Sequence, residues 1–254
     1  MDNILEKRLK IKSFDVGYDG RVKLSFILNH MQDIAGEHAA ALGVSIRELH
    51  KKNLAWVLSR YHIIFVGHPK WGDDIVLRTW PYSKEKHFSL REFEALDDTN
   101  EQLLRATSSW MIINLSTRKP VSPGDVLPDY PVNPVRMIAD KFSNLAIDDA
   151  YENALDFRVR LNDLDVNGHV NHTVYVEWAI ESIPAQFRKD HLIKEIEIVY
   201  RGEAFLENSV RSYSNCHYTG DDDLAVYHHQ IIRQDDSKEL TRLKTTWAPL
   251  VSGA

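Results

Sequence analysis

The sequence predicts an α+β fold of two tandem units, each an antiparallel sheet wrapped around one long helix. Three observations predict it. An apolar helix pattern near the N-terminus is followed by four strand-like runs, the same order returns in the C-terminal half, and a proline-rich stretch separates the two halves. With 254 residues the chain is long enough for two such units, each with a buried core.

The N-terminal unit, expected over residues 1–118, opens with extended chain and a helix. Apolar residues between 8 and 23 are spaced by twos and threes around a YDG turn. A helix pattern follows up to Leu42, with Ser25 as a possible cap and Gly43 as a stop signal. Runs rich in Val, Ile, Trp and Phe then predict strands at Leu54 to Val66, Asp73 to Tyr82, His87 to Leu96 and Gln102 to Leu115.

A linker is expected over residues 119–151. Five prolines fall between Pro120 and Pro134, and a polar, acidic stretch follows them. Structureless connections of this length are uncommon inside one compact unit. The C-terminal unit is therefore expected over residues 152–254, with an apolar helix pattern from Val170 to Ile183. Its strands are predicted at Asp156 to Leu161, Ile193 to Arg201, Ser209 to Tyr218, Leu224 to Arg233 and Glu239 to Trp247.

Two short matches indicate that the halves arose by duplication. IIFVG at 63–67 aligns with IVYRG at 198–202, and ATSSW at 106–110 aligns with LKTTW at 243–247, with offsets of 135 and 137 residues. In this alignment His68 lies opposite Glu203. The first half has no counterpart of the polar residues that precede the second helix, so the chemistry is expected in the C-terminal half.

Those polar residues are Asp163, Asp165, Asn167 and His169, which recur at every second position. In an extended conformation their side chains would leave the chain on one side. Because a helix pattern follows, the cluster is expected at a helix N-terminus, where free N–H groups favour a carbonyl oxygen that gains negative charge. Gly168 would let a ligand approach the backbone. The alternative, equally supported by spacing, is that Asn167 caps the helix and the acids complement its dipole.

The segment DLDVNGHVNHTVYVEW, followed by ES, and the block VYRGEAF at 199–205 resemble the acyl-acyl-carrier-protein thioesterases, which release fatty acids in plant plastids and many bacteria. The shorter pattern DxDxxGHVNxxxY is shared with wider hotdog-fold thioesterases. The resemblance implies two tandem hotdog units. It also implies that the N-terminal unit supplies much of the acyl pocket and the C-terminal unit the catalytic residues.

The resemblance implies hydrolysis of fatty acyl thioesters of acyl carrier protein by activated water, without a cofactor. The catalytic residues carried over by position are Asp165, Asn167, His169 and Glu203. Glu203 is the expected general base, while His169 shares the proton or orients the water. Asn167 could donate to substrate or water, and Asp165 could hold its neighbours or polarise the site. The backbone N–H of Gly168 or His169 is the candidate oxyanion donor.

One position departs from the family. Many plant members have a cysteine directly after the glutamate, whereas this chain has Ala204, so a cysteine acyl-enzyme at that position is excluded. Cys216 is expected to be a small buried residue instead. Met31, Ile34 and Trp56 are the candidate walls of the acyl pocket. Rival readings are an acyl-coenzyme A thioesterase and a non-catalytic sensor of acyl thioesters, although a sensor needs no water-activating base.

Composition narrows the partners and the compartment. A net charge of −6 argues against general nucleic-acid binding. Acyl carrier protein is also acidic, so cations must gather locally, and the candidates are Arg118/Lys119, Arg188/Lys189 and Arg201. No signal-peptide-like segment or uncharged apolar run of about 18 residues is found, which predicts a cytoplasmic, bacterial enzyme without a membrane span. The single cysteine fits a reducing compartment. A homodimer stays an open alternative.

Other chemistries lack their sequence patterns. His169 and His172 form an HxxH pair, but no convincing carboxylate or cysteine set accompanies it, so no metal is expected. His228 and His229 are expected to alternate across a strand, one inward and one outward. GxSxG, glycine-rich phosphate-loop and CxxC patterns are absent from the sequence. Nucleotide cofactors and a serine nucleophile therefore have no support.

Overall fold

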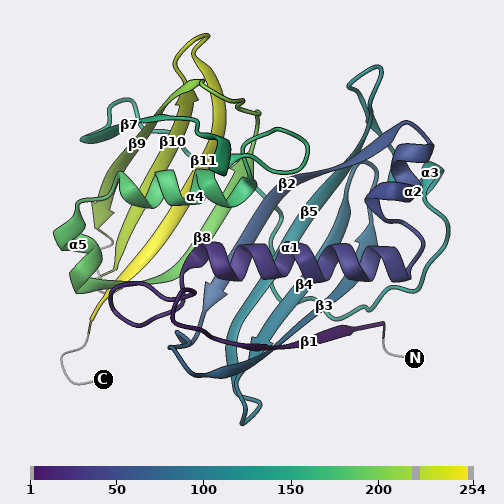
Figure 1. Cartoon of the computed structure of the whole chain (residues 1–254), viewed down its shortest axis with the longest axis horizontal. Helices are drawn as coiled ribbons and strands as arrows, with labels where there is room; N and C mark the ends of the chain where they lie inside the picture. The colour runs from purple at the N-terminus through teal and green to yellow at the C-terminus, as the bar shows by residue number, and fades with distance from the viewer. Residues whose placement is uncertain (1–2, 219–223, 251–254) are drawn as a thin grey trace. The chain divides into compact units, whose positions relative to one another are not determined.

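The computed structural model describes residues 3–218 and 224–250 and divides into two compact units, Met1–Lys141 and Phe142–Ala254 (Figure 1). The boundary falls inside the expected linker, 119–151. That stretch also contains short regular elements, β6 (Pro120–Val121) and α3 (Pro123–Val126), which belong to the first unit. Each unit is described by itself below.

The N-terminal unit is an antiparallel sheet with a long helix, α1 (Leu24–Ala41), across one face (Figure 1). The strands follow the order β1-β3-β4-β5-β2, and β6 pairs with β5. One side of α1 is buried, including Met31 and Ile34. The other elements are β1 (Leu5–Lys10), α2 (Ile46–Lys51), β2 (Leu54–Phe65), β3 (Asp74–Lys84), β4 (Ser89–Leu96) and β5 (Gln102–Asn114).

The predicted strands of this unit match those observed to within a few residues, but two details differ. The expected extended segment at 8–23 is a strand only in β1, and its remainder is loop with one isolated bridge between Val16 and Val22. The N-cap of α1 is Lys23, not Ser25. Gly43 follows the helix with a φ of 72°, a left-handed conformation that glycine adopts without a Cβ clash, as the stop signal predicted.

The C-terminal unit repeats this plan with a shorter helix, α4 (His172–Glu181), across its sheet (Figure 1). The strand order is β8-β11-β10-β9-β7. A second short helix, α5 (Ala185–Asp190), was not predicted, and it begins directly after Pro184. The other elements are β7 (Asn153–Arg158), the 3-10 turn η1 (Leu161–Asp163), β8 (His191–Tyr200), β9 (Ser209–Tyr218), β10 (Ala225–Arg233) and β11 (Lys238–Pro249).

The duplication is visible in strand order and register. After its helix each unit places its four strands in the order second, third, fourth, first, and a preceding strand flanks the second. Ile63 pairs with Ala106 in the first unit, and Ile198 pairs with Leu243 in the second. These four residues are the first positions of the two sequence matches. Two matches of five residues therefore located equivalent strand pairs.

Hydrogen bonds repeat as well. Trp110 Nε1 donates to Ser108 Oγ over 2.9 Å, and Trp247 Nε1 donates to Thr245 Oγ1 over 2.8 Å. At the end of the first strand of each pair, Gly67 N donates to the Leu103 carbonyl over 2.9 Å and Gly202 N donates to the Leu240 carbonyl over 3.0 Å. Each carbonyl also accepts the N–H of the residue before the glycine.

Both units therefore have the hotdog arrangement that the resemblance implied. Within the part of the chain that the structure describes, no helix is long and apolar enough to cross a bilayer.

Candidate active site

The segment from Asp165 to His169 is a tight turn organised by the Asp165 carboxylate. Oδ1 of Asp165 accepts the backbone N–H of Asn167 at 2.8 Å and that of His169 at 3.2 Å. The Asp165 backbone closes the turn, since its N–H donates to His169 O and its carbonyl accepts from Gly168 N. Gly168 has a φ of 76°, which explains a glycine here. An isolated bridge between Leu164 and Val170 flanks the turn.

The turn lies just before the helix N-terminus, since His169 is two residues before the N-cap. Helix α4 begins at His172, and its N-cap is Asn171, whose side chain accepts the N–H of Thr173 at 3.0 Å. Asn167 therefore does not cap the helix, and the alternative reading of that residue is wrong. Asn167 is exposed, and its amide donates to Asp165 Oδ2 over 3.4 Å.

Asp163 does not join the cluster. It closes η1 and is buried, with its carboxylate paired to Arg160 at 2.7 Å and accepting the Arg160 N–H at 2.8 Å. Its carbonyl accepts the N–H of Asn171. The spacing of two predicted a shared side for all four polar residues, but the chain turns between Asp163 and His169 instead of running extended.

His169 and Glu203 come together from segments 34 positions apart in the chain. His169 Nδ1 lies 3.4 Å from Glu203 Oε1, and both side chains are about one-third exposed, at 33% and 37%. Direct hydrogen bonds between heavy atoms measure about 2.6–3.2 Å, and catalytic contacts are often longer without substrate. The His169 ring also meets Phe205 edge-on, with 5.1 Å between the ring centroids. The His169 ring is therefore held between Glu203 and Phe205, and the His169–Glu203 pair is accessible to solvent.

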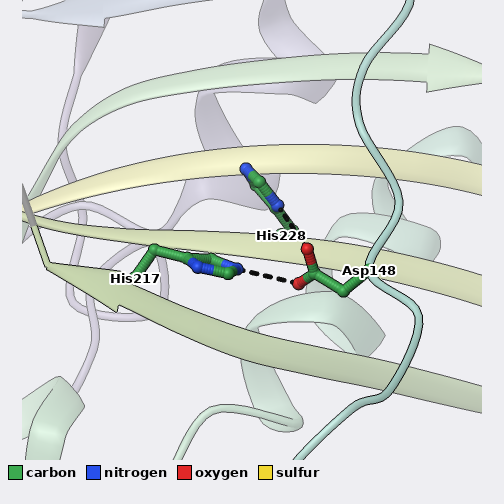
Figure 2. A group of neighbouring side chains, drawn as sticks. All are labelled: Asp148, His217 and His228. Carbon is green, nitrogen blue, oxygen red and sulfur yellow. Dashed lines mark hydrogen bonds and ion pairs between the residues drawn. The ribbon is translucent and has the colours of Figure 1, made fainter.

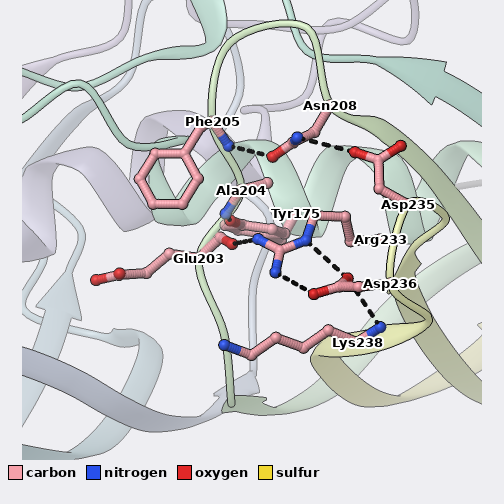
Figure 3. Close-up of polar contacts among 9 residues, drawn as sticks. All are labelled: Tyr175, Glu203, Ala204, Phe205, Asn208, Arg233, Asp235, Asp236 and Lys238. Carbon is pink, nitrogen blue, oxygen red and sulfur yellow. Dashed lines mark hydrogen bonds and ion pairs between the residues drawn. The ribbon is translucent and has the colours of Figure 1, made fainter.

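Backbone contacts hold Glu203 in place (Figure 3). Ala204 N donates to the Tyr175 hydroxyl at 2.9 Å, and the Ala204 carbonyl accepts the N–H of Val170 at 3.0 Å. These bonds tie the glutamate segment both to α4 and to the end of the polar turn. Arg233 Nη1 donates to the Glu203 carbonyl over 2.8 Å. Figure 3 shows the Glu203 side chain pointing away from this guanidinium.

Arg233 is itself fixed by Asp236. Two hydrogen bonds of 2.9 and 2.6 Å join its guanidinium to the carboxylate, and Arg233 lowers the pKa of Asp236 to about 2. Burial raises the pKa of Tyr175 to about 12, so its hydroxyl is neutral at all ordinary pH values. Tyr175 occupies the last position of the DxDxxGHVNxxxY pattern, which is the signal that could have found it. Nothing in the sequence singled out Arg233.

The two candidate oxyanion donors already have partners within the turn. Gly168 N donates to the Asp165 carbonyl at 3.0 Å, and His169 N donates to Asp165 Oδ1 at 3.2 Å. The second bond is the longer one, so the His169 N–H is the more easily shared of the two.

The candidate pocket walls lie in the N-terminal unit. Met31 and Ile34 are fully buried on the sheet-facing side of α1. Trp56 is half-buried and packs against a separate cluster of Val44, Leu49, Leu54, Ile112 and Leu127. Its indole N–H donates to the Val44 carbonyl over 2.8 Å.

Of the remaining residues, the two strand histidines alternate as predicted. His229 is fully buried, whereas His228 is partly exposed on the other side of β10. Cys216 is only partly buried, less than expected, and burial raises the pKa of its thiol. That shift disfavours the nucleophilic thiolate.

Two of the candidate carrier-binding cations have carboxylate partners. Arg188 forms a two-pronged pair with Glu181 at 2.8 and 3.0 Å, and Arg201 Nε lies 3.4 Å from Glu239. Among the described residues of this unit, the His169 and His172 pair is not part of any group of side chains arranged to hold a metal ion.

Protein-family models cover most of the chain. The model described as the acyl-ACP thioesterase N-terminal domain matches residues 2–130, and the C-terminal domain model of the same family matches residues 147–249. Among curated relatives, a chloroplastic acyl-[acyl-carrier-protein] hydrolase of Cuphea viscosissima is 27% identical over 264 residues. The match covers 98% of this chain and 64% of the relative, so the chain spans less than two thirds of that protein.

Two solved structures are similar over nearly their whole length. An acyl-ACP thioesterase from Bacteroides thetaiotaomicron superposes with a TM-score of 0.83 at 26% identity, covering 97% of this chain and 98% of that one. The 12:0-ACP thioesterase from Umbellularia californica also gives a TM-score of 0.83, at 27% identity, covering 97% of this chain and 94% of that one.

Proposed function

This chain belongs to the acyl-ACP thioesterase family, and we propose on that basis that it hydrolyses fatty acyl thioesters of acyl carrier protein to free fatty acid and carrier. The observation that carries the proposal is the His169–Glu203 pair, 3.4 Å apart and open to solvent, beside an alanine that cannot act as a nucleophile. The base therefore acts on water.

In this mechanism Glu203 takes a proton from a water molecule. At the same time the water oxygen attacks the carbonyl carbon of the thioester. The tetrahedral intermediate then expels the thiolate of the carrier, and the proton passes to the sulfur through Glu203 or His169. Tyr175 and Arg233 act as positioning residues, because Tyr175 accepts the Ala204 N–H and Arg233 donates to the Glu203 carbonyl.

For the oxyanion we favour the His169 N–H, assisted by the Asn167 amide. Both donors have long bonds to Asp165, of 3.2 and 3.4 Å, and Asn167 is exposed. A developing oxyanion is a stronger acceptor than a carboxylate already shared among several donors. Gly168 N has the shorter bond and remains the second candidate.

Chain-length choice is proposed to lie in the N-terminal unit, with Met31, Ile34 and Trp56 as walls. Their burial supports this role for Met31 and Ile34. Each methylene housed contributes about 0.8 kcal/mol, so a bulkier wall should remove a few carbons from the preferred chain. Met31→Trp should shift released products to shorter acids, as gas chromatography of the fatty acids would detect. An unchanged product profile would remove Met31 from the wall.

Two exposed arginines support an anionic carrier near the site. The side chains of Arg158 and Arg160 are 71% and 75% exposed, and each also pairs with a carboxylate, of Glu207 at 3.5 Å and of Asp163 at 2.7 Å. They lie near the loop that follows Glu203, because Glu207 N donates to the Val159 carbonyl over 3.2 Å. Coenzyme A is anionic too, so charge does not distinguish the two acyl carriers, and only kinetic measurements on both can do so. The cytoplasm and a possible homodimer remain predictions, the first supported by a single cysteine.

The test is release of free fatty acid by wild-type protein from a chain-length series of acyl carrier protein thioesters, beside the same acyl groups on coenzyme A. We expect a higher kcat/KM on the carrier. Higher kcat/KM on coenzyme A would replace the proposed substrate, and tight binding of both without turnover would identify a sensor.

A further inference from the structure

A second polar cluster lies in the C-terminal unit, built from Asp148, His217 and His228 (Figure 2). His217 is in β9 and His228 in β10, and they lie diagonally across the pair, since His228 is opposite Asn215. Asp148 comes from the segment that precedes β7. Its two oxygens face one imidazole each, with 2.9 Å from Oδ2 to His217 Nε2 and 3.0 Å from Oδ1 to His228 Nδ1.

The cluster is more confined than a surface ion pair. The side chains of Asp148 and His228 are only 13% and 20% exposed, while that of His217 is 45% exposed. The imidazole ring centroids are 4.6 Å apart. The Asp148 carboxylate therefore faces both imidazole rings from a mostly buried position.

We propose that Asp148, His217 and His228 bind one divalent transition-metal ion, with zinc the best match. Two imidazole nitrogens and one carboxylate are ligands that Zn²⁺ prefers, and the same set disfavours Mg²⁺ and Ca²⁺, which take oxygen ligands. The three donor atoms all lie within 4.8 Å of one another. Ligands at about 2.0–2.2 Å from a tetrahedral zinc ion are roughly 3.4 Å apart, so small side-chain rotations bring them to the metal.

The consequence of binding is structural. Asp148 belongs to the chain segment that enters β7, while the histidines stand on two paired strands. A shared ion would join this segment to the sheet and stabilise the folded chain by an amount that rises with the logarithm of the zinc concentration once the site is filled. This inference is independent of the proposed thioesterase activity, and its test needs no substrate.

The experiment measures Zn²⁺ binding by calorimetry at pH 7.5, using the full chain without a polyhistidine tag. His217→Ala and Asp148→Asn are the test variants. The matched control is His87→Ala, an exposed histidine in the β3–β4 connection of the N-terminal unit. We expect one high-affinity ion per wild-type chain and a loss of roughly tenfold or more in affinity in each test variant. The control should bind as wild type does.

One further readout separates a built site from adventitious histidine binding. Zinc should raise the thermal midpoint of wild type and of the control, but not that of His217→Ala. Equal affinity in wild type and both test variants, or no binding to wild type, would overturn the proposal and leave a hydrogen-bonded Asp–His–His group.

Discussion

Asp165 shows how one residue can have a different task from the one its motif suggests. It stands among acids and imidazoles, yet both of its oxygens are used inside the turn, on the N–H groups of Asn167 and His169 and on the Asn167 amide. The charge of Asp165 is therefore less important than its acceptor geometry. The turn closed by Asp165 fixes the backbone of His169, and this places the His169 ring beside Glu203.

Replacing Asp165 separates these two roles. Asn can still accept the two backbone N–H groups through its own Oδ1, so Asp165→Asn should keep most of the activity and stability. Asp165→Ala removes the acceptor and should cost about 1–3 kcal/mol in the free energy of unfolding, with a clear fall in kcat. Denaturant unfolding and steady-state kinetics measure both effects. Loss of activity in Asp165→Asn without loss of stability would instead assign the charge to the chemistry.

Among the secondary-structure elements, the end of β8 fixes the position of the proposed base, Glu203. Gly202 shares the Leu240 carbonyl with the preceding residue, and Glu203 follows directly. A Cβ at Gly202 would lie 3.0 Å from the Glu239 carbonyl oxygen, which is backbone. The equivalent Gly67 would bring its Cβ to 2.9 Å from Leu103 Cδ2, the end of a side chain that can rotate. Because of the duplication, a substitution at Gly67 is a control for the same substitution at Gly202.

Gly202→Ala should lower stability by about 1–3 kcal/mol through overpacking. It should also lower kcat by roughly tenfold or more, because a small displacement of a catalytic group is costly. Gly67→Ala should cost less stability and leave kcat near the wild-type value, since Leu103 can move. Thermal melts and kinetics of both variants test this, and equal kcat values for the two would contradict the role of the β8 end.

The same elements show what the sequence could predict. Strands and the long helix α1 were found because their apolar periodicity and turn residues are local signals. The duplication was found because IIFVG and IVYRG, and ATSSW and LKTTW, still match at nearly one offset. The helix pattern from Val170 came within two residues of the start of α4 at His172. The alternative that Asn167 caps this helix was wrong, although Asn167 and Asn171 are equally good caps in composition. Only the three-dimensional turn decides which one accepts a helical N–H.

The site was predicted in part for a related reason. His169 and Glu203 are distant in sequence, and the resemblance alone brought them together. The contact of Arg233 with the Glu203 carbonyl depends on how β10 ends, and no periodicity encodes it. Asp163 was included in the cluster because alternation implies an extended chain, whereas η1 turns its carboxylate toward Arg160.

At the scale of the whole molecule, each unit keeps one buried histidine neutral. Burial, with Arg91 nearby, lowers the pKa of His38 to about 4, and burial, with His228 nearby, lowers that of His229 to about 3. The unfolded chain takes up these protons near pH 6.5, but the folded chain resists them. The contribution of these two histidines to the free energy of unfolding is therefore fully present above pH 6.5. It is lost as the pH falls toward their pKa values in the folded chain.

His229→Gln should remove part of this acid sensitivity. Between pH 6.5 and pH 5 the wild-type chain should lose about 2 kcal/mol through His229 alone, and the variant should not, because Gln does not titrate. Gln can also keep a hydrogen bond to Thr245, the partner of His229 at 2.9 Å. Thermal midpoints of both proteins across this pH range would reveal the difference. Parallel pH profiles would show that His229 is protonated in the folded chain.

In the proposed mechanism Glu203 activates water with the help of His169. The most direct measurement is kcat on an acyl carrier protein thioester for Glu203→Gln, beside Glu207→Gln, an exposed glutamate four positions later that pairs with Arg158. Gln keeps the volume and removes the base. We expect a fall of about 10²–10⁴ in kcat for Glu203→Gln, an unchanged melting midpoint, and near wild-type kcat for Glu207→Gln. A Glu203→Gln protein that turns over at a rate close to wild type would contradict the role of Glu203 as the base.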